Sequence, residues 1–87
     1  MKWQISYSKR ADKFIKKQKI EDKVKATIER FILRYAGEDV NIDVKKLRGK
    51  WQGYHRIRIG ELRIIVKVDK DRDYIIVDTV DFRRSLY

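Results

Sequence analysis

The chain has 87 residues and a formal net charge of +10 at pH 7, which is enough length for one domain, residues 1–87, with a modest core. It has no Cys and a single histidine, His55, which excludes disulfides, a thiolate nucleophile and multi-His metal sites. The charge favours a polyanionic partner: nucleic acid, an anionic membrane surface or an acidic protein. Because no apolar run approaches the roughly 20 residues of a membrane span, we expect a soluble, cytoplasmic protein.

A strand and two helices are predicted in the first part of the chain. Apolar and polar residues alternate over 2–7, the period of a half-buried strand. Ser8 is a suitable N-cap for a short helix that ends near Lys19. A second helix is predicted from about residue 20 to residue 36, where Gly37 can supply a left-handed stop. Its apolar stripe has the helical spacing of three and four: Ile20, Val24, Ile28, Phe31, Ile32 and Tyr35.

A β-hairpin dominates the later part of the sequence. Residues 38–50 are predicted as a loop with a short extended piece around 44–47, followed by a turn at 50–53. Residues 56–64 then form two strands, and Gly60 takes the positive φ at the first central position of their turn. Three segments follow: a tip at 69–73, an inner strand at 74–80 that is apolar on both faces, and a polar tail at 81–87.

The hairpin places three arginines on one face. Its register sets Ile59 opposite Leu62, Arg58 opposite Arg63 and Ile57 opposite Ile64. Since side chains alternate between faces, the aliphatic residues share the buried face, and Arg56, Arg58 and Arg63 share the other. The pairing of Arg58 with Arg63 costs roughly 0.2–1 kcal/mol, which selection for stability alone would avoid. We interpret the three arginines as a binding site for an anion.

The predicted order of elements is β-α-α-β-β-β, in which the hairpins make the last strands antiparallel. Two helices then cover one face of the sheet. The fold class is α+β, an antiparallel sheet with an N-terminal helical hairpin packed on one face. The opposite face is basic and partly exposed, which suits the backbone of RNA.

Three segments resemble the RelE/ParE superfamily of bacterial and archaeal toxins. Lys46-Leu47-Arg48-Gly49 and the hairpin from Tyr54 to Ile65 are similar to the family pattern K-L-x-G … Y-R-x-R-x-G-x-Y-R. The segment 81–87, D-F-R-R-S-L-Y, is similar to the family ending hydrophobic-G-H-R-x-x-x-Y. The resemblance covers essentially the whole chain and implies a RelE-like fold.

The resemblance also implies a function. RelE-type members are toxins of type II toxin–antitoxin systems, endoribonucleases that cleave mRNA in the ribosomal A site by attack of a 2′-hydroxyl on the adjacent phosphodiester, which inhibits translation. This chemistry needs a base, cations for the developing charge and an acid for the 5′-oxygen. The family's catalytic positions correspond here to Arg56, Arg58, Arg63, Arg83 and Tyr87. The implied partners are an acidic, neutralising antitoxin and the ribosome with mRNA in its A site, with no metal, cofactor or membrane.

The chain departs from the family pattern in two ways. Arg56 and Arg58 stand where RelE has lysines, and a guanidinium can clamp phosphate but does not readily act as a base. The base is therefore open among His55, which alternation directs away from the arginines, Glu61 and Asp81. Phe82 stands where many members have His and could instead stack on a nucleobase.

Six residues are predicted to contact RNA around the arginines. They are basic or aromatic: Lys46, Arg48, Lys50, Trp51, Tyr54 and Phe82. Core or edge packing is the alternative for Trp51 and Tyr54. Two other functions stay open, a ParE-like toxin that inhibits DNA gyrase without nuclease activity and a basic RNA-binding domain that does not cleave.

Overall fold

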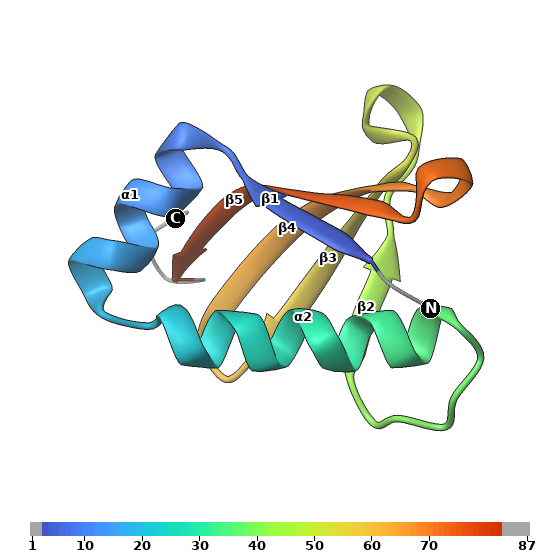
Figure 1. Ribbon diagram of the computed structural model, residues 1–87, viewed down its shortest axis with the longest axis horizontal. Helices are drawn as coiled ribbons and strands as arrows, with labels where there is room; N and C mark the ends of the chain where they lie inside the picture. The colour runs from blue at the N-terminus through green and yellow to red at the C-terminus, as the bar shows by residue number, and fades with distance from the viewer. Residues whose placement is uncertain (1–2, 83–87) are drawn as a thin grey trace.

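The computed structural model describes residues 3–82, which form a five-stranded sheet with two helices on one of its faces (Figure 1). The helices are α1 (Lys9–Gln18) and α2 (Glu21–Tyr35). The strands are β1 (Gln4–Tyr7), β2 (Asp43–Lys46), β3 (Tyr54–Ile59), β4 (Leu62–Asp69) and β5 (Tyr74–Phe82), in the spatial order β1-β5-β4-β3-β2. Two short 3-10 turns precede β3 and β5: Gly49–Trp51 and Lys70–Arg72. Within the described residues no helix is long and apolar enough to cross a membrane.

The predicted α+β class with a helical hairpin on one face is confirmed. The direction of strand β1 differs from the predicted antiparallel sheet. Strands β2 to β5 pair antiparallel, whereas β1 pairs parallel to β5 at the edge of the sheet, so the sheet is mixed. The alternating pattern of β1 is the same in both directions. Only the path of the chain through α1 and α2 to the far edge of the sheet decides which strand β1 meets.

Two strands differ in extent from the prediction. The extended piece expected around 44–47 is strand β2, which pairs with β3 from Asp43 to Lys46. Strand β5 runs past the predicted end at Val80, because Asp81 and Phe82 continue its ladder opposite β4. The polar tail therefore contributes two residues to the sheet, and its remainder, 83–87, lies outside the described residues.

Capping residues set the start and end of α1. The predicted N-cap Ser8 is confirmed, since its Oγ accepts a hydrogen bond from the backbone N–H of Ala11 at 3.1 Å. The same hydroxyl donates to the carbonyl oxygen of Asp78 at 2.6 Å, which ties the start of α1 to β5. The helix ends at Lys19 in the left-handed conformation, with a φ of 57°.

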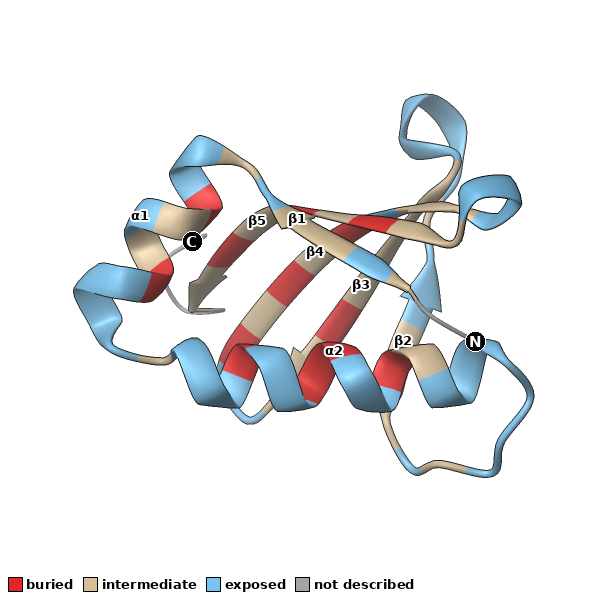
Figure 2. Ribbon diagram, viewed as in Figure 1, coloured by how far each residue is buried: buried red, intermediate tan, exposed pale blue. Residues whose placement is uncertain are grey.

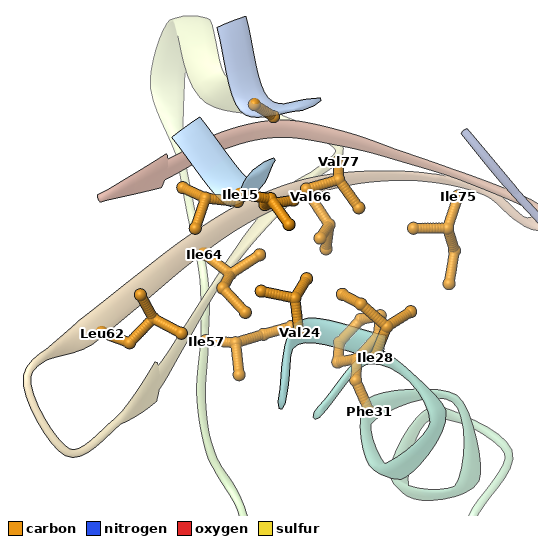
Figure 3. Close-up of a cluster of buried hydrophobic side chains, with 12 residues drawn as sticks. Ile15, Val24, Ile28, Phe31, Ile57, Leu62, Ile64, Val66, Ile75 and Val77 are labelled. Carbon is orange, nitrogen blue, oxygen red and sulfur yellow. The ribbon is translucent and has the colours of Figure 1, made fainter. Parts of the chain in front are cut away.

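The core lies between the helices and the inner face of the sheet. Figure 2 shows buried residues alternating with half-buried ones along β4 and β5, the buried Ile57 in β3, and further buried residues on the sides of α1 and α2 that meet the sheet. In Figure 3 Val24 and Ile28 of α2 reach toward Ile57 and Ile64 of the sheet. All four are fully buried, so the predicted α2 stripe supplies the centre of the core.

The hairpin has the predicted register. Ile59 pairs with Leu62, Arg58 with Arg63 and Ile57 with Ile64. Gly60 has a φ of +60°, and Glu61 is not among the residues with positive φ, which corresponds to a turn that needs glycine only at its first central position. Between β4 and β5 the pairing passes from Ile65↔Thr79 to Val66↔Val77, so Asp78 is the extra residue of a β-bulge.

We predict that Ile64→Ala destabilises the fold by about 2–5 kcal/mol, because it leaves a cavity at a fully buried site. Leu33→Ala removes an equally large side chain that is 49% exposed on α2 and is expected to change stability by about 0.5 kcal/mol or less. Urea unfolding of both variants measures the difference. Equal losses in the two variants would contradict this placement of the core.

Candidate active site

Charged side chains cross the face of the sheet that is opposite the helices. Residues paired across neighbouring strands share a face, so the strand register defines two rows from β2 to β5. One row, called here the charged row, is Asp43, Arg58, Arg63 and Asp81; the next is Lys45, Arg56, Ile65 and Thr79. The arginine face predicted from the hairpin is therefore present, and the structure adds a carboxylate at each end of the charged row.

Arg56 and Arg63 line a cavity of about 370 Å³ on this face, called here the main cavity. Its other described lining residues are Leu47, Trp51, Ile65, Thr79 and Asp81. The volume is within the range of small-ligand sites, and the lining combines apolar surfaces with two guanidinium groups and one carboxylate. Such a lining can hold a planar base and a phosphate side by side.

Arg58 lies across from Arg63 but lines a neighbouring cavity. That cavity has a volume of about 230 Å³ and includes Thr27 and Arg30 of α2 as well as Asp43. Two of the three predicted arginines thus share the main cavity, and the third flanks it.

Each arginine of the main cavity has an acidic neighbour. Arg56 Nη2 lies 3.4 Å from Asp43 Oδ1, and the Arg56 side chain is only 14% exposed. Arg63 Nε lies 3.9 Å from Asp81 Oδ1, which is a charge contact but too long for a hydrogen bond. The two acids reduce the repulsion between Arg58 and Arg63. They do not cancel the positive charge, because Lys45 also belongs to this face.

Several polar atoms of this face are buried without a hydrogen-bond partner among residues 3–82. They are the Nε atoms of Arg56, Arg58 and Arg63 and the Oδ1 atom of Asp81. Buried polar groups in folded proteins are nearly always hydrogen-bonded. These groups therefore keep hydrogen-bonding capacity that the described residues do not use, and three of the four side chains, those of Arg56, Arg63 and Asp81, share the main cavity.

Two predicted RNA-contacting rings lie beside the main cavity. The rings of Trp51 and Tyr54 meet edge to face with centroids 5.2 Å apart, and Trp51 is 42% exposed. The Nζ atom of Lys67 lies 5.8 Å from the centroid of the Tyr54 ring. Tyr54 is therefore packed at the side of the site, whereas Trp51 presents open ring surface.

The structure corrects the position of Phe82. It pairs with the buried Leu62, and its ring meets that of Phe14 in α1 with centroids 5.5 Å apart. Because β5 continues through Asp81, alternation turns Phe82 toward the helices. The prediction that Phe82 stacks on a nucleobase beside the arginines is therefore wrong.

The predicted basic rim is also rearranged. Lys46 pairs with His55 on β3, so its side chain belongs to the helix-facing side of the sheet. Lys45, which is not among the six predicted RNA-contacting residues, shares the face of Arg56 because it pairs with Arg56 across β2 and β3. Arg48 and Lys50 are exposed around the 3-10 turn before β3, and their contact with RNA stays a prediction.

His55 faces the core side, as alternation predicted. Its ring meets those of Phe31 and Tyr35 with centroid distances of 5.5 and 5.8 Å. Burial and, secondarily, the charge of Lys46 lower the pKa of His55 below its ordinary value. This histidine is separated from the arginines by the sheet itself.

Two predicted catalytic residues, Arg83 and Tyr87, lie outside the described residues. Within residues 3–82 no group of three or more His, Asp or Glu side chains is placed to hold a metal ion. The described cavity contributes the guanidinium groups of Arg56 and Arg63 and the carboxylate of Asp81.

Comparisons with known proteins identify the family. No protein-family model matches the chain. Toxin RelE3 of Methanocaldococcus jannaschii is 35% identical over 68 residues, which cover 78% of this chain and 74% of that protein. A chain of the RelB–RelE antitoxin–toxin complex from Methanococcus jannaschii is 29% identical with a TM-score of 0.67 and 94% of both chains covered. A chain of the DinJ–YafQ complex from E.coli shares the fold, with a TM-score of 0.72, 19% identity and 99% of both chains covered.

This chain belongs to the RelE family of toxins, so the resemblance recognised in its sequence is confirmed.

The lowered pKa of His55 predicts a pH-dependent stability. The unfolded chain binds a proton at His55 more readily than the folded protein does. The contribution of the neutral His55 to the free energy of unfolding is therefore fully present above the unfolded pKa of about 6.5. It falls as the pH drops from there through the lower folded pKa. Urea midpoints at pH 7.5 and 5.5 measure the loss, and His55→Phe should reduce the difference between them. An unchanged pH dependence in that variant would contradict the assignment.

Proposed function

We propose that this chain is the toxin of a type II toxin–antitoxin pair and acts as an endoribonuclease that cleaves mRNA in the ribosomal A site. The observation that carries the proposal is the main cavity, where the half-buried Arg56 and Arg63 side chains have Nε donors without a partner in the described part of the chain. Membership of the RelE family supports the same conclusion.

The two arginines suit the demands of phosphodiester cleavage. When a 2′-oxygen bonds to phosphorus, negative charge grows on the non-bridging oxygens until the bond to the 5′-oxygen breaks and leaves a 2′,3′-cyclic phosphate. Fixed N–H donors at that position stabilise the transition state more than the ground state. Guanidinium groups supply charged, forked donors for phosphate oxygens, and Trp51 can receive the adjacent base on its exposed ring.

Three further residues complete the proposed set. Arg58, opposite Arg63 in the charged row, extends the positive surface along the RNA backbone. Arg83 and Tyr87 are proposed from the sequence resemblance alone, as a second phosphate ligand and as a proton donor or stacking group.

An antitoxin is the proposed regulatory partner. The RelB–RelE and DinJ–YafQ structures are complexes of toxins with antitoxins. In this chain, with its net charge of +10, we propose that an acidic segment covers the arginine face and orders as it binds. Such a segment would block the entry of mRNA into the main cavity.

Cleavage on programmed ribosomes tests the proposal directly. Purified protein is added to ribosomes stalled with a defined codon in the A site, and the 5′ ends of the fragments are mapped. We expect a cut within the A-site codon and no effect on gyrase supercoiling in a parallel assay. Intact mRNA together with blocked supercoiling would favour a ParE-like toxin, and RNA binding without any cut would favour a non-catalytic RNA-binding domain.

We predict that Arg63→Ala lowers the cleavage rate by about 10²–10³-fold, the usual cost of removing a donor to a developing oxyanion. Stability should change by about 0.5 kcal/mol or less, since the variant also relieves the repulsion with Arg58. Arg72→Ala is the matched control, because it removes the same charge from a side chain that is 81% exposed on the tip before β5. Equal effects of the two variants on cleavage, or unfolding of Arg63→Ala, would contradict the assignment.

A further inference from the structure

The reaction needs a group that accepts the proton of the 2′-hydroxyl, and the arginines cannot supply it. Arg56, Arg58 and Arg63 are permanently protonated and have no acceptor atom. The sequence leaves three candidates: His55, Glu61 and Asp81. Their positions in the fold separate them.

Two of these candidates lie outside the main cavity. His55 is on the other face of the sheet, with its ring against those of Phe31 and Tyr35. Glu61 is exposed at the tip of the β3–β4 turn and is not among the described residues that line the main cavity. Neither can reach a phosphodiester held by both Arg56 and Arg63 without a rearrangement of the sheet or of the turn.

Asp81 has the position that a base requires. It lines the main cavity with Arg56 and Arg63 and pairs directly across from Arg63 in the sheet. Its side chain is 21% exposed, and Oδ1 is buried without a hydrogen-bond partner among the described residues. The other carboxylate of the charged row, Asp43, is 58% exposed and lines the neighbouring cavity instead.

The contact between Asp81 and Arg63 leaves both groups able to act. At 3.9 Å the two charges attract and hold the carboxylate in place, but this separation is too long for a hydrogen bond. A phosphate that accepts hydrogen bonds from Arg63 competes with Asp81 for the guanidinium. The Asp81 carboxylate, which lines the main cavity, is then free to accept a hydrogen bond from a neighbouring hydroxyl.

We propose that the Asp81 carboxylate is the general base of the cleavage reaction, a role that rests on the proposed nuclease function. The 2′-hydroxyl proton passes to the Asp81 carboxylate while the 2′-oxygen bonds to phosphorus. The bond between phosphorus and the 5′-oxygen breaks, and that oxygen takes a proton from solvent. Asp81 then releases its proton to water, which restores the carboxylate.

Substitution of Asp81 tests this role on programmed ribosomes. Asp81→Asn keeps the shape of the side chain but cannot accept the proton, so single-turnover cleavage should fall by about 10²–10⁴-fold. Binding to ribosomes whose A-site codon carries an uncleavable 2′-deoxynucleotide should be as tight as that of the wild type or tighter, because a negative charge is removed. Asp71→Asn removes the same charge from an exposed residue of the tip and should leave cleavage unchanged.

Chemical rescue separates a base from a residue that only positions Arg63. Asp81→Gly leaves space beside Arg63 that formate can enter, and added sodium formate should raise its cleavage rate in a concentration-dependent way. Sodium chloride at the same ionic strength should not. Asp81→Glu, which moves the carboxylate by one methylene, should retain measurable activity, and urea unfolding checks that every variant is folded.

Several outcomes would overturn the role. Cleavage by Asp81→Asn within a few-fold of the wild type would exclude Asp81 as the base and leave the nuclease function standing. Equal losses in Asp81→Asn and Asp81→Glu, or a loss without formate rescue, would reduce Asp81 to a positioning or stabilising residue. Intact mRNA with the wild-type protein would overturn the proposed function and this role with it.

Discussion

Burial of the aliphatic side of the β3–β4 hairpin is the constraint on which the site depends. Ile57, Leu62 and Ile64 are almost completely buried against the helical layer, and a slip of one residue in the register would turn all of them to solvent. The same slip would carry the arginines into the core, where unpaired charge is very unfavourable. The hydrophobic core therefore holds three guanidinium groups on the open face.

The open face combines this fixed geometry with unbalanced charge. The structure places Asp43 and Asp81 at the ends of the row that contains Arg58 and Arg63, which gives the like-charged pair partial compensation within the fold. Asp43 and Asp81 do not balance the charge of the arginines, and they do not satisfy all of their hydrogen-bond donors. The Nε donors of all three arginines have no partner within residues 3–82. Fixed donors of this kind are the preorganised arrangement that the proposed cleavage of a phosphodiester requires.

The two faces of the sheet carry different kinds of side chain. The helix-covered face contains the buried apolar side chains and His55, whose ring is part of the packing around Phe31. The opposite face contains the arginines, Asp81 and the exposed ring of Trp51, with the β-bulge at Asp78 interrupting the ladder beside the main cavity. Changes to the side chains of the open face can thus alter the proposed chemistry with little effect on the core, as expected for a small domain whose stability depends on few buried residues.

Local patterns in the sequence were sufficient for the elements and for the register of the hairpin. Ser8 as an N-cap, the α2 stripe around Ile28, the turn at Gly60 and the pairing of Arg58 with Arg63 all depend on neighbours in the chain or on alternation, which one sequence displays directly. The family resemblance could likewise be recognised from short motifs.

Long-range pairing decided the rest. The parallel direction of β1 depends on how the helical hairpin leads the chain across the sheet, and β1 alone has the same alternation in either direction. The weak pattern of β2 and the polar residues after Val80 concealed two ladder segments, so the sequence could not place Lys45 and Asp81 on the arginine face or turn Lys46 and Phe82 away from it. The sequence by itself determined which residues alternate and which charges the hairpin carries. Only the tertiary structure decided which carboxylates lie beside the arginines, because those contacts join strands that are brought together by the folding of the whole chain.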